Sequence, residues 1–338
     1  MTTIKDIAKA AGVSVTTVSR ALNGYSDVKE LTRQKIVAVA KELNYSPNSL
    51  ARSLVMNKSQ TIGLLVSGFT KESVKDNFTV EVLAGVNECA SEMNYDLVLF
   101  NTNSSMQREK TYTQLCRERR VDGVIIQGIR TDDPYLKEVV DSDIPCVLID
   151  IPIASENVGY VTTDNELGAD KAVQHLIELG HRNIGMVNGH EYAFVSQKRL
   201  NGYKRALENA GLPFKPEYVV DGSYKEGESN KVTKELLSNH PEITAIFCAS
   251  DLMAIGSLKA VQEIGKKVPA DISIIGYDDI LLASYVSPAL TTIAQNKFQL
   301  GFEAAQMLLN LLTKGDQLKQ VILHTELKER NSTASIKK

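Results

Sequence analysis

Between residues 14 and 23, small polar side chains and one arginine gather on one side of a predicted helix. At about 100° of rotation per residue, a single arc of this helix carries Val15, Thr16, Ser19, Arg20 and Asn23. An arginine can donate two hydrogen bonds to O6 and N7 of guanine, and a threonine can contact a thymine methyl group. This arc therefore favours recognition of base edges in the major groove of DNA.

The residues before this arc predict the helix pair that would position it. Residues 4 to 11 have the apolar spacing of one helical face, and Thr3 and Asp6 have the spacing of a capping box. Gly12 can adopt the left-handed conformation that ends a helix, and Ser14 can cap the next one. The chain therefore turns within three residues, which predicts a helix-turn-helix.

A third helix is predicted from Thr32, as its N-cap, to Asn44, and it would close a small core with the apolar arc of the second helix. The apolar positions on these two helices are Val18, Ala21, Leu22, Ile36, Ala40 and Leu43. An ordinary amphipathic helix pair whose polar side is only solvated is the alternative interpretation. The steep turn and the third helix favour the DNA-binding one.

Ser46 and Pro47 have the types expected at an N-cap and the first helical position, and they open a short segment too small to bury itself. With this segment, the phrases VSVTTVSRALNG and YSPNSLARSL resemble the headpiece of the lactose/galactose-repressor (LacI/GalR) family of bacterial transcription regulators. The resemblance implies a headpiece over residues 1–60 with a hinge helix at about 47–56. It places base-reading side chains on the second helix and a minor-groove wedge at Leu54. The DNA-contacting residues predicted in this way are Ser14, Val15, Thr16, Thr17, Ser19, Arg20, Asn23, Ala51 and Leu54.

Charge is distributed unevenly along the 338 residues. Residues 1–60 hold nine Lys or Arg and four Asp or Glu, a net charge of +5, whereas the remaining residues carry −8. A basic headpiece would attract phosphates and an acidic body would stay outside the duplex. A solvated imbalance without a role is the alternative, but the charge boundary coincides with the motif boundary.

Other sequence features argue against several classes of protein. Four cysteines lie far apart without a CxxC pair, so we expect reduced thiols, no disulfides, no metal and no cofactor. No apolar run approaches the roughly 18 residues needed to span a bilayer, and we expect a cytoplasmic protein without a membrane partner. The chain contains no GxGxxG, GxxxxGK[ST] or GxSxG motif. His190 and Glu191 begin a zinc-protease motif, but Phe194 stands where its second histidine would be, so we expect no enzyme.

After residue 60, short apolar runs alternate with amphipathic helical stretches, as in TIGLLVSG, DGVIIQG, PCVLID, NIGMVNG, AIFCAS and SIIGYDD. This rhythm predicts an α/β core with two doubly wound parallel sheets. We expect lobes over roughly 61–160 and 161–290. The later segments LTTIAQ and QVILHTELKER would follow the second sheet, with some of them crossing back to the first lobe.

The body also resembles the family's periplasmic-binding-protein-like core, through LIELGHRNIGMVNG, KRLNGYKRALENAGL and DISIIGYDDI. In such a core a ligand binds between the lobes, at the carboxyl ends of the strands. Asp150 and Asp278 end predicted strands, and Arg199 matches a family arginine that contacts the effector. The effector-binding residues predicted from strand ends and resemblance are Phe78, Asp150, Arg199, Tyr224, Ser250, Asp251 and Asp278.

Some of these residues have ordinary structural explanations as well. An aspartate after a strand commonly caps a helix or forms a turn, and for Asp251 capping and ligand contact are equally compatible with the sequence. Phe78 suits either a cavity wall or the packing of the following helix. Ser250 replaces an asparagine that is common in the family, so it offers a ligand a hydroxyl instead of an amide.

The sequence thus predicts a ligand-responsive DNA-binding regulator, a repressor of carbohydrate-utilisation genes controlled by a small sugar. Its partners would be a palindromic double-stranded operator and a second copy of the chain. Residues 328–338 contain no leucine heptads, which favours a dimer over a tetramer. The alternatives are a solute-binding protein or sugar-acting enzyme on the same core, and a regulator controlled by a phosphorylated ligand or a protein corepressor.

Overall fold

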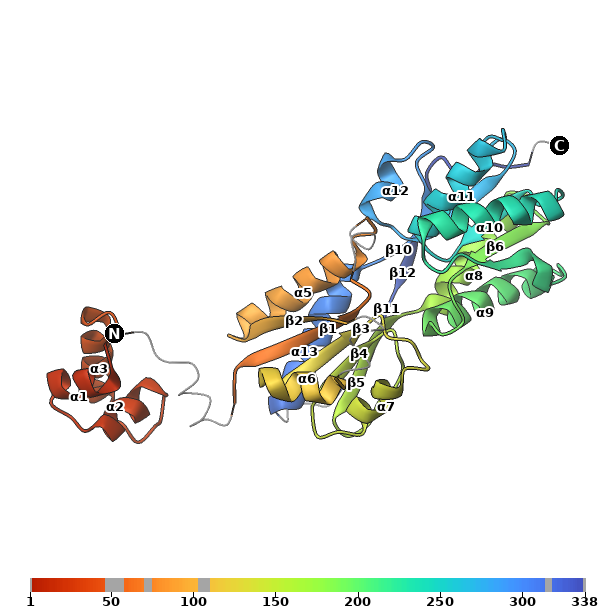
Figure 1. Ribbon diagram of the computed structural model, residues 1–338. Coiled ribbons are helices and arrows are strands. Elements are labelled where there is room, and N and C mark those ends of the chain that lie inside the picture. Colours follow the sequence, from red (N-terminus) through yellow and green to blue (C-terminus); the bar gives the residue numbers. More distant parts are fainter. Residues whose placement is uncertain (1, 46–57, 70–74, 103–109, 314–317, 337–338) are drawn as a thin grey trace. The chain divides into compact units, whose positions relative to one another are not determined.

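The structure is a computed structural model that describes residues 2–45, 58–69, 75–102, 110–313 and 318–336. The chain forms two compact units, a headpiece of residues 1–60 and a core of residues 61–338 (Figure 1). The predicted hinge helix at about 47–56, with Ala51 and Leu54, lies outside the described residues.

The described part of the headpiece contains three short helices: α1 (Ile4–Ala11), α2 (Val15–Leu22) and α3 (Glu30–Glu42). They enclose a small apolar core in which Ile7, Val18 and Ile36 are fully buried. Because this core takes one face of each helix, the polar arc of α2 remains outside it.

The caps explain how α1 gives way to α2. Thr3 and Asp6 form the predicted capping box at the start of α1. Gly12 has a φ of 67°, which a residue with a side chain rarely adopts, and Ser14 accepts a hydrogen bond from the Thr17 backbone N–H at 3.0 Å. The predicted start of α3 was wrong: α3 begins at Glu30, so Thr32 lies inside its first turn. The N-cap of this helix is Lys29, and no side chain makes a capping hydrogen bond there. The capping preference of threonine therefore led to a wrong start for α3.

The core consists of two lobes, each built on a six-stranded sheet (Figure 1). In the first lobe the strand order is β11-β5-β4-β3-β1-β2, with all neighbours parallel. Its strands are β1 (Thr61–Ser67), β2 (Asp96–Thr102), β3 (Gly123–Gln127), β4 (Cys146–Ile149), β5 (Val158–Thr163) and β11 (Gln320–Leu323). Helices α5 (Phe78–Glu92) and α13 (Lys297–Thr313) cover one face, and α6 (Tyr112–Arg119) and α7 (Pro134–Val140) cover the other.

Two glycines bring α5 and α13 close together. A Cβ at Gly85 would collide with the carbonyl oxygen of Phe298, and a Cβ at Gly301 would collide with that of Val82. The two helices therefore cross with their backbones in contact, which fixes α5 on the sheet. The amino end of α5 borders the cavity described below.

In the second lobe the strand order is β12-β10-β9-β8-β6-β7. Its strands are β6 (Ile184–Asn188), β7 (Val219–Asp221), β8 (Ala245–Cys248), β9 (Ser273–Asp278), β10 (Thr291–Gln295) and β12 (Thr325–Lys328). Its helices are α8 (Asn165–Glu178), α9 (Phe194–Asn209), the 3-10 turn η2 (Pro216–Tyr218), α10 (Glu226–Asn239), α11 (Asp251–Glu263) and α12 (Leu281–Tyr285). One continuous apolar cluster fills this lobe.

The late part of the chain crosses back to the first lobe, as the sequence predicted, and the structure adds the details. The first sheet extends to Thr163, close to the expected boundary at roughly 160. The segment QVILHTELKER forms two strands in different sheets, because β11 pairs with β5 of the first lobe and β12 pairs with β10 of the second. The pairing of β12 with β10 is antiparallel, so the second sheet is not wholly parallel as predicted.

Candidate functional site

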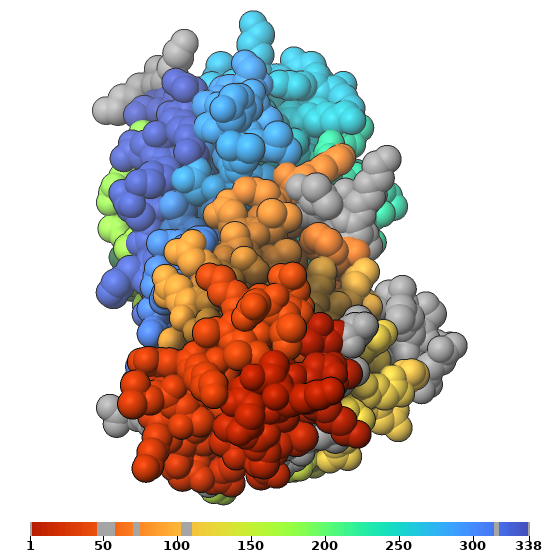
Figure 2. Space-filling view, turned by 90° about the vertical axis from the view of Figure 1, so that its left-hand side faces the viewer, coloured from red at the N-terminus to blue at the C-terminus, as the bar shows by residue number. Residues whose placement is uncertain are grey.

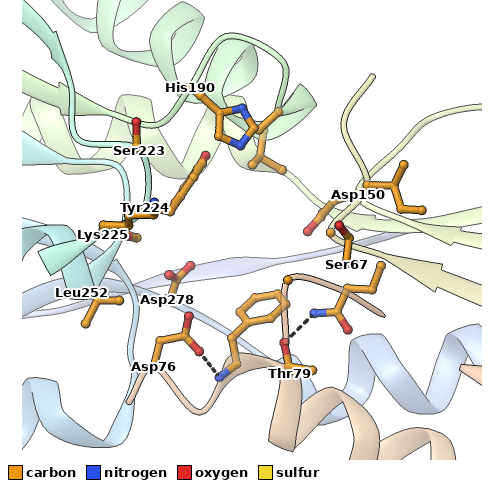
Figure 3. A pocket seen from close by; sticks show the side chains of 18 of the residues that line it. Ser67, Asp76, Thr79, Asp150, His190, Ser223, Tyr224, Lys225, Leu252 and Asp278 are labelled. Atoms are coloured by element: carbon orange, nitrogen blue, oxygen red, sulfur yellow. Dashed lines mark hydrogen bonds between the residues drawn. The ribbon is translucent and has the colours of Figure 1, made fainter. Parts of the chain in front are cut away.

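A cavity of about 760 Å³ lies between the lobes, at the carboxyl ends of strands from both sheets (Figure 3). Ser67, Gln127 and Asp150 reach it from the ends of β1, β3 and β4. His190 and Asp278 reach it from β6 and β9 of the second lobe. This is where doubly wound folds bind ligands, since backbone and side-chain polar groups converge there.

Three aspartates direct their carboxylates at the cavity (Figure 3). Burial raises the pKa of Asp150, although the Thr162 hydroxyl, which donates to its Oδ1 at 2.6 Å, favours the charged form. Burial also raises the pKa of Asp278, against the opposing effect of Arg199. The pKa of Asp76 rises to about 6, because burial disfavours its charge and the Asp278 carboxylate adds repulsion. The cavity is therefore rich in hydrogen-bond acceptors.

Arg199 on α9 is the buried cation of the site, with an exposed fraction of 3%. Its Nε donates to Asn165 Oδ1 at 2.9 Å and its Nη1 donates to the Ala249 carbonyl oxygen. Nη1 also lies 3.7 Å from Asp278 Oδ1, and the Tyr277 ring centroid is 3.8 Å from Cζ. Most of the guanidinium is thus committed to the protein, and Arg199 also lines the cavity.

Phe78 and Tyr224 line the cavity from opposite lobes, and Figure 3 shows the ring of Tyr224. The Tyr224 hydroxyl lies 2.8 Å from Ser196 Oγ, which fixes the ring. Ser250 lines the cavity too, but its Oγ accepts the Met253 backbone N–H and caps α11.

The prediction that Asp251 contacts the ligand is not supported by its position. Its side chain is fully buried and does not line the cavity. Its carboxylate accepts hydrogen bonds from the Thr292 hydroxyl at 2.5 Å and the Ile280 backbone N–H at 2.9 Å. Asp251 therefore ties α11 to β10 and to the segment that follows β9 inside the second lobe, because both of its oxygens accept hydrogen bonds from that lobe.

Gln127, Asp76 and His190 are among the polar residues of the cavity that the sequence interpretation missed. Within the described ranges, Gln127 Oε1 and His190 Nδ1 are buried without a hydrogen-bond partner, which is uncommon for polar atoms in folded proteins. Gln127 is the last residue of β3, so the strand-end rule that selected Asp150 would have selected it as well.

Several contacts join the lobes beside the cavity. Lys75 Nζ lies 2.9 Å from Glu226 Oε2, and both residues line the cavity. On another side, the Thr131 backbone N–H donates to the Tyr192 carbonyl oxygen at 2.9 Å. A change in the angle between the lobes would break such contacts, so they belong to one arrangement of the lobes.

In the headpiece, the polar arc of α2 is accessible to solvent. Val15 has an exposed fraction of 41%, Thr16 is exposed, and the Arg20 side chain is 43% exposed. Ser14 and Thr17 bond to each other at 2.8 Å at the start of α2. Ser19 and Asn23 are half-buried and bond weakly at 3.4 Å.

Family models match both units of the chain. A model described as bacterial regulatory proteins, lacI family, matches residues 3–48, and one described as a periplasmic binding protein-like domain matches residues 173–333. The HTH-type transcriptional repressor PurR of Vibrio vulnificus is 36% identical over 339 residues, which cover 99% of this chain and all of that protein. The chain belongs to the LacI family. The PurR repressor of Proteus mirabilis is 38% identical over 338 residues, covering 99% of this chain and 97% of that one.

Solved LacI-family structures share the whole architecture. The lac repressor dimer bound to operator and the anti-inducer ONPF has a TM-score of 0.82 and 29% identity, and covers 98% of this chain and 99% of its own. A complex of the transcriptional regulator CelR with cellobiose has a TM-score of 0.77 and 31% identity, and covers 98% and 100%. This LacI-family chain is therefore a ligand-responsive DNA-binding transcriptional repressor.

Two further findings concern the described part of the chain only. No helix in it is long and apolar enough to cross a membrane. Its histidine, cysteine and carboxylate side chains form no group of three or more that could hold a metal ion.

Proposed function

We propose that this repressor acts as a homodimer on a palindromic operator and is controlled by a neutral, hydroxyl-rich effector of the sugar type. The observation that carries the proposal is the chemistry of the interlobe cavity. Its carboxylates accept hydrogen bonds, and sugar hydroxyls donate them. The aromatic wall of Tyr224 suits the apolar face of a sugar ring. We also propose that this repressor acts in the cytoplasm and controls genes of carbohydrate utilisation.

The same chemistry disfavours a phosphorylated ligand. A phosphate would stand near the carboxylates of Asp76, Asp150 and Asp278, and like charges in a buried site repel strongly. Arg199, the buried cation of the described cavity wall, already donates to Asn165 and Ala249. A neutral ligand avoids that repulsion.

For the operator, we propose that the exposed arc of α2 reads base edges. Arg20 suits bidentate pairing with a guanine, and Val15 and Thr16 suit apolar contact with a thymine methyl. The basic headpiece supplies the attraction to phosphates that is independent of sequence. Ala51 and Leu54, outside the described residues, retain their proposed roles from the sequence.

The proposed dimer face includes α12 and the neighbouring start of α5. Leu281 and Tyr285 have exposed fractions of 62% and 78%, and Val80 on α5 is 42% exposed. The Leu281 backbone N–H donates to Asn77 Oδ1 at 3.2 Å, so the two elements adjoin, and Figure 2 shows their light blue and orange surfaces on one side of the core. Exposed apolar groups of this kind commonly mark protein interfaces.

In the proposed mechanism, the effector shifts an equilibrium between two lobe arrangements. It can do so only by its difference in affinity for them, and operator binding must then change effector affinity by the same factor. Contacts such as Lys75 to Glu226 would exist in one arrangement and not in the other.

The test is a thermal-shift screen of the full chain against neutral mono- and disaccharides, amino sugars and sugar phosphates, followed by operator-binding assays with each ligand found. We expect a neutral sugar to raise the melting temperature and to change operator affinity. A response to sugar phosphates alone would contradict the proposed effector class. Binding of a sugar without any effect on operator affinity would favour a solute-binding role instead.

A further inference from the structure

The side chain of Arg20 is already held by the headpiece when no DNA is present. Asp27 Oδ2 accepts a hydrogen bond from Arg20 Nε at 2.8 Å and lies 2.8 Å from Nη2. The Tyr25 ring centroid is 4.6 Å from Cζ, so the ring covers one face of the guanidinium. One edge and one face are thus occupied, while Nη1 makes no hydrogen bond to any described residue.

The loop that carries these two partners is anchored to the helices on both sides of it. Arg33 of α3 donates to the Ala21 carbonyl oxygen at 2.8 Å and to the Tyr25 carbonyl oxygen at 2.5 Å. Val28, which follows Asp27 directly, is buried in the headpiece core. The backbone position of Asp27 is therefore set by the fold, which keeps its carboxylate within reach of Arg20.

We propose that Asp27 is a positioning residue for base reading by Arg20. A guanidinium can present two N–H groups to guanine either from its Nε edge or from its Nη1 and Nη2 end. Because Asp27 occupies the Nε edge, Arg20 presents its Nη1 and Nη2 end. This inference rests on the proposed function, in which Arg20 reads a base.

The same contact reduces binding to DNA of the wrong sequence. A carboxylate beside Arg20 partly neutralises it toward phosphates, which supply the sequence-independent part of DNA affinity. The exposed pair contributes little to folding, since such ion pairs are screened by water. Asp27 therefore lowers the affinity for all DNA, and it fixes the geometry that only a matching guanine satisfies. Specificity is the difference between the affinities for matching and for other DNA, and Asp27 increases it.

The experiment uses the full chain and a duplex that the wild-type protein selects from a random pool. Affinities for this duplex and for a scrambled one of equal length are measured for Asp27→Asn, which keeps the shape and removes the charge. We expect the scrambled duplex to bind more tightly and the ratio of the two affinities to fall about fivefold or more, the lower range of one bidentate base contact.

Glu42→Gln is the matched control for charge. Glu42 is exposed at the end of α3, and its loss changes the headpiece charge by the same unit. We expect it to tighten both duplexes by one common factor and to leave the ratio unchanged. The same result for Asp27→Asn would overturn the proposal, because Asp27 would then act through its charge alone.

Arg20→Ala separates failure of the inference from failure of the proposed function. We expect this variant to lower the affinity ratio, and we expect Asp27→Asn to have no further effect on the ratio when Arg20 is absent. If Arg20→Ala leaves the ratio unchanged, base reading by Arg20 is rejected and Asp27 has nothing to position. If the double variant loses specificity beyond Arg20→Ala, Asp27 acts through another residue. Helix melting by circular dichroism confirms that each headpiece is folded.

Discussion

Two arginines of this chain have the same kinds of neighbour in opposite surroundings. Arg20 in the headpiece pairs with an aspartate at 2.8 Å, lies over a tyrosine ring at 4.6 Å, and is 43% exposed. Arg199 in the core lies 3.7 Å from an aspartate and 3.8 Å from a tyrosine ring centroid, and its side chain is 4% exposed. The partner types are alike, but the Arg20 side chain is largely exposed and the Arg199 side chain is buried.

The difference in burial assigns different tasks to the two arginines. An exposed pair is separated at low cost, so Arg20 can exchange a protein partner for a base. A buried pair cannot be separated without leaving a charge alone in a medium of low polarity, so Arg199 is a permanent part of the cavity wall. Exchangeable contacts suit the binding of many DNA sequences in turn, whereas fixed contacts suit selection of one ligand.

We expect the largest effect from a substitution of the buried arginine. Arg199→Met leaves Asp278 without its nearest cation, and we expect the free energy of unfolding to fall by about 3–5 kcal/mol and the effector response to vanish. Arg205→Met on the same helix is the control, since Arg205 pairs with Glu166 and Asp170 at a half-exposed site. Denaturant unfolding should give a loss below about 1 kcal/mol for it. Equal losses for the two variants would remove the distinction.

The next effect concerns pH. The pKa of Asp76 is about 6 in the folded chain against an ordinary value of 3.8, so the folded state holds its proton longer than the unfolded state. Stability from this group is therefore full below about pH 4 and is lost as the pH rises to about 6, by up to about 3 kcal/mol. We expect Asp76→Asn to match wild type at pH 4 and to exceed it at pH 7.5 in denaturant unfolding. Glu88→Gln, an exposed change on α5, should show no such difference, and parallel pH curves for Asp76→Asn and wild type would contradict this account.

A smaller effect is expected on the exposed side. Arg20→Ala should cost about 1–3 kcal/mol of operator binding free energy and change binding to scrambled DNA far less. Because Arg20 is exposed, the free energy of unfolding should change by less than about 0.5 kcal/mol. Titration of both duplexes and thermal melting provide the measurements. Equal losses on the two duplexes would assign Arg20 to the phosphates.

The smallest effect comes from the ring beside Arg20. Tyr25→Ser removes an exposed contact between a cation and an aromatic ring, and we expect a loss of about 0.5–1 kcal/mol in headpiece stability. A double-mutant cycle with Arg20→Ala isolates this contact. A coupling free energy near zero would mean that the ring only covers the loop.

The sequence predicted most of the fold because its signals are local. Strands buried on both faces appear as apolar runs, which is how β1, β3, β4, β8 and β9 were found. The separation of β11 from β12 depends on which sheet each strand joins, and β5, the partner of β11, lies more than 100 residues away along the chain. No local pattern contains this information.

The site was predicted in part for a related reason. Strand ends identified Asp150 and Asp278, because all strand ends of a parallel sheet meet at one edge. The same rule selected Asp251, whose carboxylate turns inward to Thr292 and Ile280. The direction of the side chain decides whether a residue lines the cavity or is buried in the lobe. That direction depends on neighbours in space, which lie far apart in the sequence.

The discontinuous path of the chain through the core has a consequence for inheritance. Helix α13 and strand β11 complete the first lobe, yet they are encoded after nearly all of the second. A gene fragment for either lobe alone would therefore specify an incomplete hydrophobic interior. The headpiece, by contrast, is one uninterrupted stretch that ends before Thr61. Recombination can therefore replace the headpiece without interrupting the core. A core that binds one ligand can acquire a new DNA target in this way, whereas the core itself must be inherited as a whole.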